Sequence, residues 1–232
     1  SVLGSLSVNQ SALNVRLSNE RPETHYFNSV SMIAVESDTN ALVLLDAENK
    51  AWPVYTLNPP ASALEQGGND IIERVRQKDG KYWESDLSQV SARGDFADVV
   101  DLTFSNASLA NEGTIVIHAI NSRLSNAVFE YLFRFLGDQT LAFLQAAEHD
   151  AEMIQLLKKW IEESSLKAFV WDGREWEKLG IVAPEANVTA FSRVIRFRVP
   201  KSIGDVKIRL IGLADVWKLD AVTVDWTRVR EL

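Results

Sequence analysis

The sequence predicts a mainly β protein, a jelly-roll-like β-sandwich with an inserted helical segment. Apolar and polar residues alternate along short stretches in both halves of the chain, which indicates half-buried strands. Between about residues 126 and 164, apolar residues fall instead at helical spacing. The alternation is clearest at Val222, Val224 and Trp226, which are expected to face the core and therefore not to bind a ligand.

The first sixty residues are predicted to form short strands. Leu13 to Leu17 and Val30 to Ala34 alternate on either side of a polar loop. Leu42 to Leu45 and Trp52 to Leu57 flank the turn-forming residues Asp46 to Asn49. This pair of segments is therefore predicted to form a hairpin.

Residues 58–119 contain turn signals followed by strands. Asn69 is placed to cap a short helix over Ile71 to Arg76. Asp79-Gly80 predicts a tight turn into Tyr82-Trp83. The alternation then predicts strands at 100–104 and 115–119.

A helical insert is predicted at about 123–164, with two or three helices. Its amphipathic stripes consist of Phe129, Leu132, Phe133, Leu136, Met153, Leu156, Leu157, Trp160 and Ile161. Such stripes require burial, so we expect the insert to pack on the sandwich and to cover one edge or face.

The chain is expected to return to strands after the insert, at 166–171, 176–182, 194–199 and 206–211 and in the terminal segment. Asp172-Gly173 predicts a hairpin between Trp171 and Trp176. Residues 1–232 are expected to form one domain, and a split near 58–62 is the alternative. The start at Ser1 suggests a processed product or a domain of a larger protein.

Composition restricts the class of partner. The net charge is −8 and the basic residues are dispersed, which argues against a nucleic-acid partner. No apolar run of about 18 residues is present, so no membrane span is expected. The absence of cysteine excludes disulfides and thiolate chemistry. It suits an intracellular or a bacterial-envelope location, and the cell envelope or extracellular space is slightly favoured.

No catalytic residue is proposed from the sequence, and the protein is not expected to be an enzyme. The three histidines, His25, His118 and His149, are too far apart in sequence for a metal-binding motif. His118 has the opposite parity to Ile115 and Ile117 and is expected to be exposed or capped. No nucleophile elbow or phosphate-binding loop is present.

Carboxylates provide a weak metal hypothesis. Glu84, Asp86, Asp95 and Asp98 lie close together in sequence and supply the oxygen ligands that calcium prefers. No cofactor is expected, and a structural Ca²⁺ ion is the alternative. Separately, Asp220 shares the parity of the core residues. It is expected either to accept from backbone amides or an arginine such as Arg209, or to reach the surface through a bulge.

The sequence contains seven tryptophans, which either pack in the core or bind a ligand through exposed rings. Tyr82 and Trp83 follow a predicted turn, and Trp171 and Trp176 flank a predicted hairpin. These four residues are the ligand-binding candidates, because exposed indole and phenol rings stack on the apolar faces of sugars.

The terminal segment WKLDAVTVDW resembles the closing strand of galactose-binding-like jelly rolls, which include many carbohydrate-binding modules. The segments RLSNERPETHYFNSVSMIAVE and RQKDGKYWESDLS, with residues 115–226, resemble an uncharacterised domain near the C-termini of large bacterial proteins. The first resemblance implies a carbohydrate ligand. The second implies no known activity.

Two functions are therefore expected. The first is a non-catalytic module of a larger bacterial protein that binds a carbohydrate. The alternative is a structural or protein-interaction domain that docks through the helical insert, since Phe129, Phe133, Phe143 and Trp160 exceed what one sandwich face covers.

Overall fold

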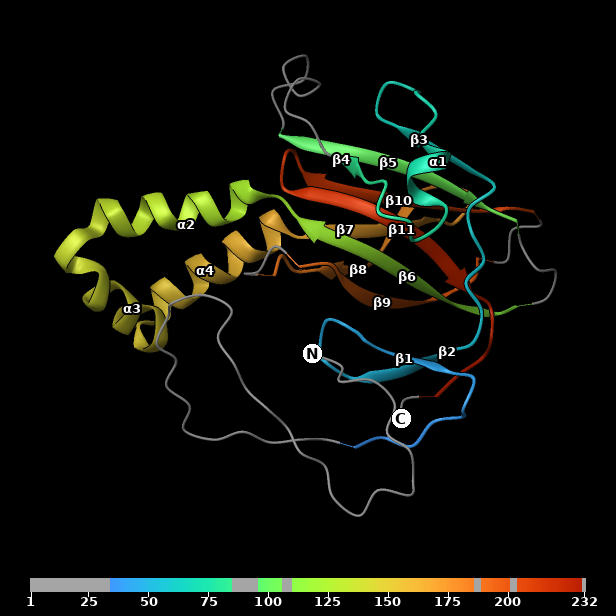
Figure 1. The fold of residues 1–232 in the computed structure, drawn as a ribbon, viewed down its shortest axis with the longest axis horizontal. Helices are drawn as coiled ribbons and strands as arrows, with labels where there is room; N and C mark the ends of the chain where they lie inside the picture. The colour runs from blue at the N-terminus through green and yellow to red at the C-terminus, as the bar shows by residue number, and fades with distance from the viewer. Residues whose placement is uncertain (1–33, 85–95, 106–109, 186–188, 201–203, 231–232) are drawn as a thin grey trace.

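The structure, a computed structural model, describes residues 34–84, 96–105, 110–185, 189–200 and 204–230 (Figure 1). The predicted strand at Leu13 to Leu17 and nearly all of the one at Val30 to Ala34 lie outside these ranges. Within them, no helix combines the length and the apolar composition that crossing a membrane requires.

Two sheets form a β-sandwich. In order, the six-stranded sheet contains β2 (Ala51–Val54), β1 (Leu42–Leu45), β9 (Phe191–Arg198), β6 (Glu112–Asn121), β11 (Trp217–Asp225) and β4 (Trp83–Glu84). The five-stranded sheet contains β3 (Ser62–Glu65), β5 (Ala97–Phe104), β10 (Val206–Leu213), β7 (Leu166–Trp171) and β8 (Trp176–Val182). Neighbouring strands are antiparallel except β1 and β9, which meet in parallel at Leu45 and Arg193. The predicted sandwich with a helical insert is confirmed.

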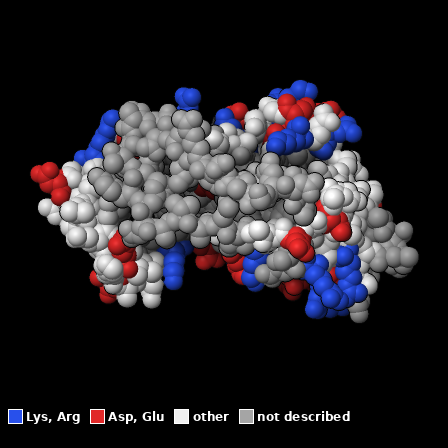
Figure 2. Space-filling view, turned by 60° about the horizontal axis from the view of Figure 1, so that its bottom comes forward, with Lys and Arg blue, Asp and Glu red and all other residues white. Residues whose placement is uncertain are grey.

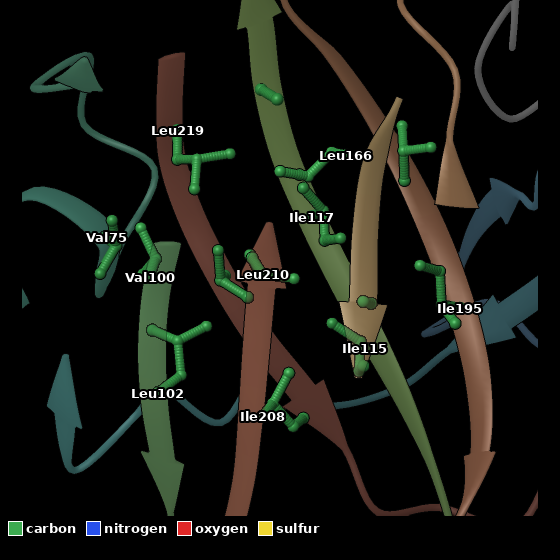
Figure 3. Close-up of a cluster of buried hydrophobic side chains, with 14 of the residues drawn as sticks. Val75, Val100, Leu102, Ile115, Ile117, Leu166, Ile195, Ile208, Leu210 and Leu219 are labelled. Atoms are coloured by element: carbon green, nitrogen blue, oxygen red, sulfur yellow. The ribbon is translucent and has the colours of Figure 1, made fainter. Parts of the chain in front are cut away.

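The main core lies between the two sheets (Figure 3). Ile115 and Ile117 of β6 face Leu102, Ile208 and Leu210 of the five-stranded sheet, and all five are at most 1% exposed. In β5 every second residue is buried, as the period of two predicts. Burial of this apolar face drives the two sheets together.

The outer face of the six-stranded sheet is covered as well. Val116 of β6 and Val194 of β9 point away from the main core and pack against Leu44, Trp52 and Val54 of the β1–β2 hairpin. The hairpin was predicted, and Asp46 closes it by accepting from the Trp52 Nε1 at 2.8 Å. The sequence does not predict its packing on the outer face, because Val116 and Val194 are distant from the hairpin in sequence.

Strand β11 is consequently buried on both sides. Val222 and Val224 face the main core with no exposed surface, as predicted. Thr223 and Asp225 alternate with these residues on the other side of the strand, and they are 6% and 1% exposed. The ladder with β6 slips between Leu219 and Ala221, which creates a bulge at Asp220.

The bulge does not carry Asp220 to the surface. Asp220 is 2% exposed, and its Oδ1 accepts from the amides of Asp79 and Gly80 at 3.1 and 2.9 Å. The expected backbone-amide network is therefore correct. The suggested partner Arg209 instead pairs with Asp101.

The helical insert consists of α2 (Arg123–Leu136), the short 3₁₀ helix η2 (Gly137–Gln139), α3 (Thr140–His149) and α4 (Ala151–Ser164), within the predicted range. Ser122 caps α2 by accepting from the Leu124 amide, and Asp150 caps α4. The insert does not lie on the sandwich as expected. Figure 1 shows it extending away, with α3 at its far end. Its base is fixed by Trp217, whose Nε1 donates to the Ser164 carbonyl at 3.0 Å.

The short helix near residue 70 forms as α1 (Ile72–Val75), but Asn69 does not cap it: the N-cap position is Ile71, with no side-chain cap. The Asp70 carboxylate accepts from the Ile72 amide at 2.9 Å. Asn69, the predicted cap, donates its side-chain amide to Glu65 instead. Asp70 is the better placed of the two because it lies only two residues before Ile72.

Candidate functional site: a cleft at the end of β11

A cleft of about 690 Å³ lies where β11 ends and β6 begins. Three chain segments that are distant in sequence meet there. It is lined by Thr56, Asn58, Ala110, Asn111, Glu112, Trp226, Thr227 and Arg228. Because Asn111, Thr227 and Arg228 are exposed, the cleft opens to solvent. Its volume lies in the range of small-molecule sites.

Asp225 holds two of these segments together. Its Oδ2 accepts from the Tyr55 amide at 2.6 Å, and its Oδ1 accepts from the Thr56 hydroxyl and the Thr227 amide at 2.8 and 2.9 Å. Burial raises the pKa of Asp225, but hydrogen bonds from Thr227, Tyr55 and Thr56 outweigh burial and lower the pKa overall. The charged carboxylate thus fixes one wall of the cleft.

Asn58 continues this wall. Its backbone amide donates to the Val224 carbonyl at 3.0 Å, and its carbonyl accepts from the Val224 amide at 2.9 Å. Its side-chain amide also donates to the Val224 carbonyl. Residues 55–58 therefore run along the edge of β11 beyond β4. The alternative domain boundary at 58–62 includes this anchored residue and the start of β3.

Trp226 supplies the aromatic surface. Its ring meets Phe197 edge to face, with centroids 6.1 Å apart, and the residue is half-buried. Gly113 makes this packing possible, because a Cβ there would lie 2.6 Å from the Phe197 ring and 3.1 Å from the indole. Trp226 thus packs on the core, as predicted, but it also lines the cleft, which the expectation that it has no part in a site did not include.

Polar groups complete the lining. Glu112 pairs with Arg196 at 3.0 Å, which fixes the direction of its carboxylate. Arg228 is exposed and makes no ion pair within the described residues. An indole, a carboxylate, a guanidinium and side-chain amides together suit a ligand with apolar faces and many hydroxyl groups.

Trp83, a predicted ligand contact, is buried. It is 6% exposed, and its Nε1 donates to Glu65 at 2.9 Å across the β3–α1 region. A ring in this position has no free face, so the prediction that Trp83 forms an exposed aromatic platform is wrong. Its neighbour Tyr82 is half-buried, and burial raises its pKa.

Trp171 and Trp176 face each other across the predicted β7–β8 hairpin, where they are directly paired. Their centroids are 5.4 Å apart and their planes are inclined by 59°, so they form no flat platform. Arg209 lies 4.3 Å above the Trp176 ring and is held there by Asp101. One face of Trp176 is thus occupied, and neither residue lines the cleft.

The metal candidates do not form a site in the described residues. Glu84 pairs with Lys218 at 2.9 Å on the six-stranded sheet, whereas Asp98 is 5% exposed on the core side of β5 in the other sheet. Asp86 and Asp95 lie outside the described ranges. Across the part of the chain that the structure describes, no three acidic or histidine side chains cluster as a metal site requires.

His118 is buried, not exposed, and its ring has a hydrogen-bond partner. It is 7% exposed on the outer face of β6, where its Nδ1 hydrogen-bonds the Ser192 hydroxyl of β9. Burial lowers the pKa of His118, and the nearby Lys78 lowers it further. Asp220 accepts hydrogen bonds from the backbone amides of Asp79 and Gly80. His118 and Ser192 therefore do not form a Ser-His-Asp triad with Asp220.

No protein-family model matches this sequence, and a search of curated proteins finds no match. The resemblances of the terminal strand and of the longer segments therefore stay predictions.

Proposed function

We propose that this protein is a non-catalytic binding module that holds a carbohydrate in the cleft beside Trp226. The observation that carries the proposal is the composition of the cleft, which combines one indole with the polar groups of Asn111, Glu112 and Arg228. Sugars present an apolar face of C–H groups to an aromatic ring and hydroxyls to amides and charges. Such contacts require no catalytic group.

The proposal places the module in a larger bacterial protein of the cell envelope or extracellular space. It is supported by the likeness of WKLDAVTVDW to the closing strand of galactose-binding-like jelly rolls. The ligand contacts move, however, from the loops first expected to the end of that closing strand. Trp226, not Trp83 or Trp176, is the aromatic residue that we assign to the ligand.

A glycan array with the wild-type protein tests the proposal, followed by calorimetric titration of the best glycan. Arg228→Ala and Asn111→Ala change exposed side chains and should not affect folding. We expect each to weaken binding about tenfold, which corresponds to one lost polar contact. Trp176→Ala is the aromatic control and should bind as the wild type does.

Two results would overturn the proposal. One is an array without any bound glycan. The other is binding that is unchanged in both Arg228→Ala and Asn111→Ala, which would place the ligand elsewhere. Loss of binding in Trp176→Ala alone would return the site to the β7–β8 hairpin.

A further inference from the structure

The helical insert has large apolar side chains that are exposed to solvent. On α2 four exposed residues form one stripe: Leu124, Val128, Tyr131 and Phe135, which are 36%, 44%, 70% and 89% exposed. Their spacing of four, three and four residues places them on one helical face. It is also the spacing of the seam through which two helices pack.

Other large apolar side chains of the insert are exposed as well. Leu141 and Leu144 of α3 are 66% and 44% exposed, and Leu156 of α4 is 61% exposed. Packing within the insert leaves these residues uncovered. Figure 2 shows mostly uncharged atoms at the left end, where α3 lies in Figure 1, with patches of Asp and Glu and some Lys or Arg at the upper edge.

Charge at this far end is mainly negative. Between residues 135 and 157 the sequence contains no lysine or arginine. The acidic residues there are Asp138, Glu148, Asp150 and Glu152. Arg123, Lys158 and Lys159 lie on the halves of α2 and α4 nearer the sandwich. Arg134, in the last turn of α2, forms an ion pair with Glu130 at 2.6 Å. An apolar stripe with an acidic end is complementary to a helix that is apolar on one face and basic on the other.

We propose that the α2–α4 insert binds a basic amphipathic helix of a partner protein. The apolar face of that helix covers Tyr131, Phe135 and Leu141, and its lysines or arginines meet the acidic far end. The same charges disfavour two other occupants. A second copy would bring acidic ends together, and an anionic membrane would be repelled. This partner is independent of the carbohydrate cleft, which lies in the sandwich.

A labelled synthetic peptide of leucine and lysine, about 18 residues long and amphipathic as a helix, is the probe. Its binding is followed by fluorescence anisotropy. We expect micromolar affinity that falls at least tenfold in Phe135→Ser/Leu141→Ser and in Asp138→Lys/Glu148→Lys. Salt at about 0.5 M should weaken binding because the screening length shrinks to a few Å. These side chains are exposed, so the variants should fold, which circular dichroism verifies.

Matched controls separate the insert from general stickiness. Phe96→Ser removes an aromatic residue that is 63% exposed on the sandwich, and it should bind the peptide like the wild type. A peptide of the same pattern with glutamate in place of lysine should not bind. Equal binding of both peptides, or unchanged binding in the insert variants, would overturn the proposal.

Two further measurements test the rejected occupants. Sedimentation that shows a dimer lost in Phe135→Ser/Leu141→Ser would assign the stripe to a second copy. Binding to vesicles of phosphatidylglycerol that depends on Phe135 would assign it to a membrane surface. Either result would replace the partner helix.

Discussion

Replacing Asp225 with asparagine tests how the cleft is held together. The two carboxylate oxygens each accept from two donors: Oδ2 from the amides of Tyr55 and Thr56, and Oδ1 from the Thr56 hydroxyl and the Thr227 amide. An asparagine must turn its NH₂ group toward one of these pairs. Two donors then lose their acceptor. Each hydrogen bond to the charged group contributes about 1.5–3 kcal/mol, but Thr56 and Thr227 are exposed and water replaces part of this, so we expect destabilisation of about 1–3 kcal/mol.

Urea denaturation at pH 7 measures this difference as a shift in the midpoint. Asp205→Asn is the matched control, since it removes the same charge from an exposed residue and should change the free energy of unfolding by less than about 0.5 kcal/mol. A loss below about 1 kcal/mol in Asp225→Asn would refute the reasoning, because the carboxylate would then not be carrying the wall of the cleft.

The pH dependence provides a second check. The folded-state pKa of Asp225 lies below its usual value of 3.8, so the unfolded chain takes up the proton first as the pH falls. The stabilisation by the carboxylate is therefore complete above about pH 5 and is lost as the pH falls through 3.8 toward the folded-state pKa. The difference in the free energy of unfolding between wild type and Asp225→Asn should be constant from about pH 6 to 8. It should decrease in acid.

Three other substitutions have defined outcomes. Gly113→Ala places a Cβ 2.6 Å from the Phe197 ring, so it should lower the free energy of unfolding by about 1–3 kcal/mol in urea denaturation. It should also weaken glycan binding, because Trp226 is displaced. An unchanged urea midpoint would contradict this packing. Trp217→Phe removes the hydrogen bond to the Ser164 carbonyl and some buried volume, so we expect a loss of about 2 kcal/mol by the same measurement. For His118, whose folded-state pKa is lowered, stability should fall as the pH drops below about 6.5, since the unfolded chain binds the proton more readily. His118→Gln should flatten that fall between about pH 7 and 5, and an identical slope in both proteins would show that His118 is not its source.

Features with local signals could be predicted from the sequence. Asp46 to Asn49 and Asp172-Gly173 are turn residues between apolar runs, and both hairpins form where these residues lie. The change from a period of two to helical spacing located the insert, because side-chain periodicity follows directly from backbone geometry.

Burial by distant segments could not be predicted. Thr223 and His118 have the polar parity of their strands, yet each lies under chain from elsewhere in the fold. Trp83 follows a turn, which suggested exposure, but it is 6% exposed and its indole donates to Glu65. In each case tertiary packing decides, and parity states only which residues share a face.

The cleft could not be predicted from the sequence without knowing which strands pair. Glu112 begins β6 and Asp225 ends β11, and these strands are antiparallel neighbours, so the residues just beyond their ends lie together. The available signal was polar residues at both places, Thr227-Arg228 after Trp226 and Asn111-Glu112 at the start of β6. It has meaning only once β6 and β11 are known to pair.

The place of β6 in the sheet has a consequence for synthesis of the chain. β6 ends at Asn121, whereas its two neighbours begin at Phe191 and Trp217. At ribosomal rates of about 5–20 residues per second, roughly 70 residues of translation separate β6 from its first partner, an interval of several seconds. During that time an apolar ten-residue strand has both edges unpaired. Nascent chains should therefore aggregate through β6 unless synthesis is slowed or a chaperone shields the strand.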